Sequence, residues 1–171
     1  RLIGAVIMTH GDERGLVLPP VVAPIQCVIV PIAAKKAGVI EACEALKAEL
    51  EEAGIRVALD KTDNSPGWKF NEWEMKGVPV RVEIGPRDIE NNVAMVARRD
   101  NLEKAPLSLD GFADTITALL DTVQKAMFEK SKNITFTENT VKILSALNTE
   151  SRQQLDSLAK ELCQEYLATQ D

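Results

Sequence analysis

An apolar run, an amphipathic segment and a second apolar run follow one another between residues 26 and 59, and this pattern limits the fold more than any other feature. Residues 26–32 (QCVIVPI) are rich in β-branched side chains, which indicates a buried strand. Residues 38–53 carry apolar side chains at helical spacing, and Gly54 after them is a helix-stop residue. Residues 55–59 (IRVAL) then form a second strand. Such a strand–helix–strand unit normally makes a parallel pair with a right-handed crossover.

Further elements are predicted on both sides of this unit. Residues 2–8 (LIGAVIM) fit either a short apolar helix or a buried strand, because so short a run has no decisive periodicity. Residues 79–84 (PVRVEI) alternate as a strand, with Arg81 and Glu83 on one face. We therefore predict an α/β fold: a mixed, mostly parallel sheet flanked by helices, with a helical C-terminal tail. The other predicted elements are a short helix over 69–76, a strand over 93–98, a long amphipathic helix over 110–130 and two helices within 138–169.

Residues 10–25 contain two Gly and three Pro, which favours a connection between domains. We predict three parts: the end of a preceding domain with its linker (1–24), a main domain (25–132) and a helical extension (133–171). No apolar stretch reaches the roughly 18 residues of a membrane span, and the N-terminal residues lack the features of a signal peptide. These observations favour a cytoplasmic protein that does not associate with membranes.

The three cysteines, Cys27, Cys43 and Cys163, are far apart and form no CxxC pair, and His10 is the one histidine. Metal ligation usually requires closely spaced pairs of ligands. We therefore expect no zinc site in this chain and free thiols, which fits a reducing compartment.

The charge of the chain is unevenly distributed. The net charge is −6, which argues against non-specific binding to nucleic acid. Residues 61–104, however, contain 8 basic and 8 acidic side chains. One interpretation is a solvated face with surface ion pairs, each worth about 0–1 kcal/mol. The other is recognition of exposed bases, because guanine offers N–H donors to a carboxylate and O6 and N7 acceptors to Arg or Lys.

Residues 60–88 contain the long pattern D-x-x-D-x-S-P-G-x-K-F-x-E-W-E-x-K-G-x-P-x-R-x-E-x-G-P-x-D. This pattern resembles the anticodon-domain signature of class II prolyl-tRNA synthetases of the archaeal/eukaryote-like type. Residues 1–26 (RLIGAVIMTHGDERGLVLPPVVAPIQ) are similar to the segment that joins the catalytic core to the anticodon domain in that family, and the resemblance extends over roughly residues 1–130. Proline anticodons carry guanine at their second and third positions, so the resemblance agrees with base recognition.

The resemblance implies roles for particular residues. Arg1 matches the arginine that ends motif 3 of class II enzymes, which contacts ATP. Trp68 and Trp73 either stack on bases or pack the short helix. The implied anticodon contacts are Glu74, Arg81, Arg87 and Asp88, with Lys69 and Lys104 as weaker candidates.

The resemblance also implies the activity of an intact parent enzyme. That enzyme would activate proline with ATP and Mg²⁺, charge tRNA(Pro) and form a homodimer through its catalytic domain. Most of the catalytic residues would lie upstream of Arg1, so we expect this chain alone to be inactive.

The residues after about 140 depart from the family pattern, because the zinc-ligating cysteines usual in this subtype are missing there. Two other hypotheses for the function of the chain stay open. One is a non-catalytic adaptor, an anticodon-binding-like domain that binds RNA or protein. The other is an α/β domain that binds a small ligand at its strand ends, which the lack of a Gly-rich loop after the first strand weakens.

Overall fold

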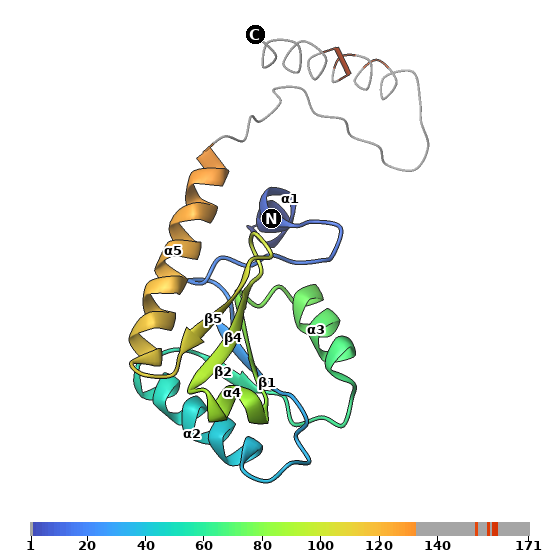
Figure 1. Ribbon diagram of the computed structural model, residues 1–171. Helices are drawn as coiled ribbons and strands as arrows, with labels where there is room; N and C mark the ends of the chain where they lie inside the picture. The colour runs from blue at the N-terminus through green and yellow to red at the C-terminus, as the bar shows by residue number, and fades with distance from the viewer. Residues whose placement is uncertain (1, 133–152, 154–156, 158, 161–171) are drawn as a thin grey trace. The chain divides into compact units, whose positions relative to one another are not determined.

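The computed structural model describes residues 2–132 together with residues 153, 157, 159 and 160. Within residues 2–132, five strands form a sheet in the order β2-β1-β3-β4-β5, and helices lie on both of its faces (Figure 1). The strands are β1 (Cys27–Pro31), β2 (Val57–Leu59), β3 (Val80–Ile84), β4 (Val93–Arg98) and β5 (Lys104–Ser108). The helices are α1 (Leu2–His10), α2 (Val39–Glu52), α3 (Pro66–Met75), α4 (Pro86–Glu90) and α5 (Phe112–Lys132).

The predicted strand–helix–strand unit is confirmed as β1, α2 and β2. β1 pairs with β2 in parallel, with Cys27 opposite Val57, and pairs with β3 in parallel on its other side. β4 is antiparallel to β3, and β5 is antiparallel to β4. The predicted mixed α/β sheet is therefore present, and its parallel ladders are confined to β2, β1 and β3.

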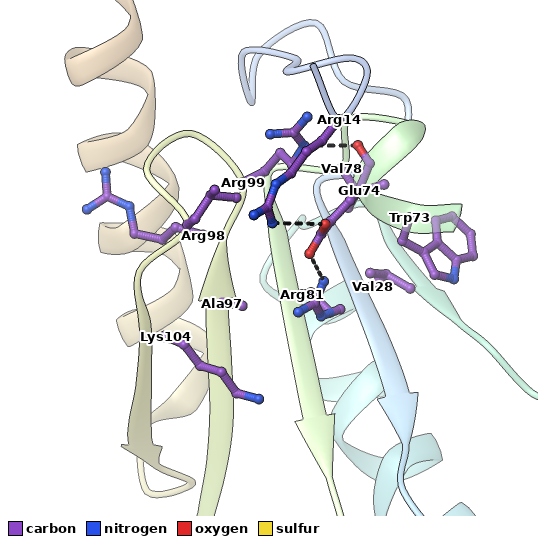
Figure 2. Close-up of a pocket in the computed structure, with 11 residues that line it drawn as sticks. Arg14, Val28, Trp73, Glu74, Val78, Arg81, Ala97, Arg98, Arg99 and Lys104 are labelled. Carbon is purple, nitrogen blue, oxygen red and sulfur yellow. Dashed lines mark hydrogen bonds and ion pairs between the residues drawn. The ribbon is translucent and has the colours of Figure 1, made fainter. Parts of the chain in front are cut away.

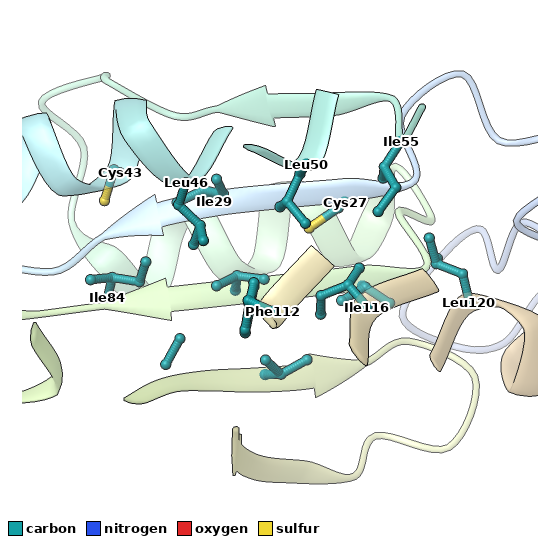
Figure 3. Close-up of a cluster of buried hydrophobic side chains, with 14 of the residues drawn as sticks. Cys27, Ile29, Cys43, Leu46, Leu50, Ile55, Ile84, Phe112, Ile116 and Leu120 are labelled. Carbon is teal, nitrogen blue, oxygen red and sulfur yellow. The ribbon is translucent and has the colours of Figure 1, made fainter. Parts of the chain in front are cut away.

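The main core lies between the sheet and the two helices α2 and α5, which cover the same face (Figures 1 and 3). Alternate residues of β1, β3 and β4 point into this layer because side chains of a strand alternate between its faces. Phe112 is the largest fully buried side chain. Cys27 and Cys43 are free and buried there, and burial raises the pKa of their thiols to about 12 and about 11.

The opposite face of the sheet is covered only in part. There α3 packs Phe70 and Trp73 against Val28 and Val30 of β1. Arg81 and Glu83 of β3 lie on this same face, since they alternate with the core residues of that strand. Across the sheet Arg81 is opposite Ala97 of β4, which is in turn opposite Lys104 of β5. A row of polar side chains is thus placed beside α3 and away from the main core.

The structure decides one alternative that the sequence left open and adds two elements that were not predicted. Residues 2–8, left open between helix and strand, belong to the helix α1. β5 and α4 were not predicted. β5 has the sequence KAPLS, which lacks a strand-like alternation and contains Pro106, so its strand conformation comes from pairing with β4 at the sheet edge.

Arg1–Lys132 form one compact unit, and Asn133–Asp171 are grouped separately. Apart from residues 153, 157, 159 and 160, which are helical, the predicted helices within 138–169 lie outside the described residues, as do Cys163 and Arg1. The division into 1–24, 25–132 and 133–171 stays a prediction. Within residues 2–132, no helix is both long and apolar enough to cross a membrane. The described side chains also contain no group of three or more His, Cys, Asp or Glu that could hold a metal ion.

Candidate nucleic-acid interface

A cavity of about 210 Å³ opens on the sheet face that α3 leaves uncovered (Figure 2). Its walls come from the end of α3, from β3, from the β4–β5 hairpin and from the loop after α1. Such a volume is below the range of about 300–1,000 Å³ typical of drug-sized ligands. The charged residues that line it are Arg14, Glu74, Arg81, Arg98, Arg99 and Lys104.

Glu74 and Arg81 face each other in this cavity because the chain turns sharply between α3 and β3. α3 ends at Met75, and Gly77 then adopts a φ of 74°, a left-handed conformation that favours glycine. Glu74 therefore lies at the end of the helix, directly beside the start of the strand. Arg81 Nη1 donates a hydrogen bond of 2.8 Å to Glu74 Oε1, as the dashed line in Figure 2 shows.

Two further side chains hold the Arg81 guanidinium group, and a third contacts one of them. Its Nε donates to Glu83 Oε1 at 3.2 Å, and its Cζ lies 4.3 Å from the centroid of the Phe70 ring, within cation–π range. Lys104 Nζ donates to Glu83 Oε2 at 2.6 Å. We refer to Phe70, Glu74, Arg81, Glu83 and Lys104 as the Arg81 cluster.

Sequence reasoning did not find Arg14 and Arg99, which approach Glu74 from distant parts of the chain. Arg14 Nη1 lies 3.6 Å from Glu74 Oε2, and Arg99 Nε donates to the Glu74 backbone oxygen at 2.9 Å. Arg99 is buried, and both of its terminal nitrogens donate to the carboxylate of Asp12 at 2.6 Å. The hydrogen bond from Arg99 lowers the pKa of Asp12 to about 2. No local sequence signal indicates these contacts, because they depend on how the loop after α1 and the end of β4 pack against α3.

The cavity carries the groups that a guanine edge requires. Glu74 supplies carboxylate oxygens that accept N–H bonds, and Arg81 and Lys104 supply donors for the O6 and N7 acceptors. Arg98 contributes less to this chemistry, since it pairs with Asp100 at 2.7 Å and points away from Glu74 and Arg81 in Figure 2. Glu74, Arg81 and Lys104 are thus three of the sequence-predicted residues that the fold brings together.

The structure places Lys69, another predicted contact, in the interior. Its Nζ donates to the Asp60 backbone oxygen at 3.1 Å and lies 3.5 Å from Asp60 Oδ1. Burial raises the pKa of the Asp60 carboxyl, but hydrogen bonds from Thr62 and Trp73 outweigh it, so the pKa is lowered overall. Lys69 and Trp73 therefore tie α3 to the end of β2.

Trp73 and Trp68 differ in their surroundings. The Trp73 indole N–H donates to Asp60 Oδ2 at 2.7 Å, and its ring packs beside Val28 and Val30, as the packing interpretation predicted. Trp68 is 53% exposed near the start of α3, so its ring is open to solvent.

Arg87 and Asp88 lie on α4, away from the Arg81 cluster. β3 advances about 3.3 Å per residue, so these residues stand beyond the far end of that strand. Arg87 is exposed. Asp88 Oδ2 accepts a hydrogen bond of 2.8 Å from Gly85 N, which caps the start of α4. Arg87 and Asp88 are therefore separated from Glu74, Arg81 and Lys104 by the length of β3, and Lys69 lies apart from both sets against Asp60.

Comparison with known proteins identifies the family of the chain. A family model described as "Anticodon binding domain" matches residues 26–119. The chain belongs to this family of anticodon-binding domains. Within the family it is related to the anticodon-binding domains of prolyl-tRNA synthetases, which its individual relatives show.

These relatives match most of this chain. A "Proline--tRNA ligase" of Acetoanaerobium sticklandii is 63% identical over 133 residues, which are 77% of this chain and 28% of that protein. A "Proline--tRNA ligase" of Lachnospira eligens is 57% identical over 132 residues, again 77% of this chain and 28% of that protein. The crystal structure of "Prolyl-tRNA Synthetase from Cryptosporidium parvum complexed with L-Proline and AMP" is 44% identical, with a TM-score of 0.73, over 76% of this chain and 29% of that one.

The chain thus spans about 28% of the length of the curated relatives it matches. Their names do not distinguish subtypes, so the archaeal/eukaryote-like assignment stays a prediction.

Proposed function

We propose that this chain is the part of a proline–tRNA ligase that selects its tRNA by reading guanines in the proline anticodon. The observation that carries the proposal is the direct pairing of Glu74 with Arg81 in the lining of the cavity of about 210 Å³. A carboxylate and a guanidinium group side by side complement the donors and acceptors of guanine, and adenine presents a different pattern. The relation to prolyl-tRNA synthetases supports this assignment over a small-ligand domain.

The two ends of β3 suggest how two adjacent guanines are read. In the proposal Glu74, Arg81 and Lys104 contact one guanine, and Arg87 and Asp88 contact the other. Splayed, unstacked bases of a single-stranded RNA loop can reach sites separated by the length of a short strand. Lys69 acts indirectly in this scheme, because its ammonium group is buried against Asp60.

The intact parent enzyme would activate proline with ATP and Mg²⁺ and esterify it to tRNA(Pro) in the cytoplasm, as a homodimer. The names of the relatives support the ligase activity. Arg1, the proposed ATP contact, lies outside the described residues. In this proposal the present chain contributes RNA selection, and a non-catalytic adaptor would share the same RNA-reading residues.

Binding of a short RNA tests the assignment directly. The probe is an anticodon stem-loop with both guanines, compared with stem-loops in which one guanine is replaced by adenine or by inosine, which lacks the N2 amino group. The parent chain should prefer the guanine RNA by about 1–3 kcal/mol per base. Arg81→Ala should weaken binding and reduce the preference over adenine, and Glu74→Gln should reduce the preference over inosine.

The matched control is Lys47→Ala, which removes one positive charge from α2 on the other face of the sheet. It should leave base preference unchanged. If Arg81→Ala and Glu74→Gln bound all three RNAs as the parent does, the site assignment would be wrong.

A further inference from the structure

Glu83 is a buried carboxylate whose two oxygens contact two different cations. Its side chain is 8% exposed; Oε1 accepts a hydrogen bond from Arg81 Nε and Oε2 accepts one from Lys104 Nζ. A carboxylate withdrawn from water is tolerated when it is paired and hydrogen-bonded, and both oxygens meet that condition here. Glu83 therefore ties β3 to β5 across the intervening strand β4.

The position of Glu83 separates it from the cavity. Arg81 and Lys104 line the cavity, whereas Glu83 is not among the described residues that do so. The Arg81 guanidinium group has Nε on Glu83, Nη1 on Glu74 and the Phe70 ring against its face. Within residues 2–132, its remaining nitrogen, Nη2, has no hydrogen-bond partner and stays available to a ligand.

The loss of Glu83 would change how Arg81 meets Glu74. Arginine and a carboxylate favour a bidentate pair, with two parallel N–H···O bonds. With Nε released from Glu83, Arg81 could turn both donors toward Glu74 and occupy the carboxylate that a base needs. Lys104, which is 41% exposed, would lose the contact that orients its ammonium group. Binding groups contribute most when their neighbours hold them in the productive geometry.

We propose that Glu83 is a positioning residue for RNA recognition: it holds Arg81 and Lys104 in the orientation that reads the base and does not itself touch the RNA. This inference rests on the proposed function of the Arg81 cluster.

The test is a double-mutant cycle on the 171-residue chain, with the same guanine and adenine stem-loops as probes. Glu83→Gln keeps the size of the side chain and removes its charge. We expect it to weaken binding about tenfold and to lower the guanine preference. In the Glu83→Gln/Arg81→Ala chain the fold-loss in affinity should be smaller than the product of the two single losses, since there is no guanidinium group left to position and Lys104 alone is released. Glu72→Gln, which breaks the surface pair with Lys76 on α3, is the matched control and should bind as the parent does.

Two outcomes overturn the proposal while leaving the proposed function in place. In one, Arg81→Ala loses base preference but Glu83→Gln keeps it. In the other, the fold-losses in RNA affinity of the two single variants multiply in the double variant, which indicates that Glu83 acts independently of Arg81. If neither variant changes base preference, the proposed function fails together with this inference.

Circular dichroism melting accompanies each measurement. If Glu83→Gln is unfolded, Glu83→Asp replaces it: the charge is kept, but the carboxylate is withdrawn by one methylene from Arg81 and Lys104. The same loss of preference is expected, and unchanged preference with Glu83→Asp contradicts the proposal.

Discussion

Arg99 joins three distant parts of the chain through one buried guanidinium group. It stands at the end of β4, donates to the Glu74 backbone oxygen at the end of α3, and pairs with Asp12 in the loop after α1. Its side chain is 2% exposed, whereas that of Asp12 is 38% exposed. A buried arginine requires a partner, so the position of Glu74 depends on a carboxylate that lies outside the cavity.

Asp12→Asn should therefore destabilise the chain, because it leaves Arg99 buried without a counter-charge. We expect a loss of about 1–3 kcal/mol in the free energy of unfolding, below the range for fully buried pairs because Asp12 is more than one-third exposed. Urea denaturation measures this loss. Glu51→Gln, which breaks an exposed pair with Lys47, is the control and should cost less than about 0.5 kcal/mol.

The lowered pKa of Asp12 predicts that the stability of the chain depends on pH. Arg99 lowers the pKa of Asp12 from 3.8 to about 2, so the ionised carboxylate stabilises the folded state fully above pH 4. This contribution is lost as the pH falls from about 4 to about 2. The difference in stability between the parent and Asp12→Asn should narrow over that interval, and a difference independent of pH would contradict the pairing.

The segment after α1 lies directly against the end of α3. Leu16 N donates to the Met75 backbone oxygen at 3.1 Å, and Leu18 N donates to the Gly77 backbone oxygen at 3.2 Å. Gly77 permits this approach, because a Cβ at this position would lie 2.6 Å from the Leu16 Cβ. Two backbones thus meet beside the helix end that carries Glu74.

Gly77→Ala should disrupt this contact. Its φ of +74° costs about 1–2 kcal/mol for a residue with a Cβ, and the overlap with Leu16 adds about 1–3 kcal/mol. Gly54→Ala is the matched control, since Gly54 has a similar φ of +82° and a Cβ added there would meet no atom within 4 Å. Thermal and urea unfolding of both variants should show the larger loss for Gly77→Ala. Equal losses would mean that the backbone conformation alone matters.

The elements that sequence reasoning predicted well are those with strong local patterns. The β1–α2–β2 unit and the long helix α5 have clear apolar periodicity, and both are present near their predicted bounds. β5 and α4 were missed for different reasons. β5 is held by its ladder with β4, and α4 is a single short turn whose start is capped by Asp88. The ladder between β4 and β5 leaves no local sequence pattern, whereas the Asp88 cap lies only three residues from Gly85 and is a local signal that the sequence prediction missed.

The candidate site was likewise predictable only where local sequence patterns place its residues. Glu74 and Arg81 are seven residues apart, on a predicted helix and strand joined by a short turn, so their proximity followed from local structure. The alternation of β3 also placed Glu83 beside Arg81. Lys69 shows the limit of this reasoning, because a lysine on a predicted helix gives no sign that its ammonium group will be buried against Asp60. The contributions of Arg14 and Arg99 depend on tertiary packing of the loop after α1 and of the end of β4 against α3.

At the scale of the whole molecule, RNA selection and chemistry are expected to be separable. The matched region is a compact unit with its own core, and it spans about 28% of the length of the relatives. The groups proposed to read the bases all lie within residues 70–104. The function of such a site depends on its own geometry, and recognition can therefore be measured apart from catalysis.

The 171-residue chain should consequently bind tRNA(Pro) without activating proline. We expect no proline-dependent ATP–pyrophosphate exchange by the chain alone, because the resemblance assigns the proline pocket and most ATP contacts to upstream residues.

A competition assay measures tRNA binding by the same chain. Excess chain should slow the charging of tRNA(Pro) by an intact proline–tRNA ligase, because it competes for the anticodon. Arg81→Ala should compete less, which separates anticodon binding from non-specific inhibition. Exchange by the isolated chain would contradict the division of roles, and equal competition by parent and Arg81→Ala would contradict the site.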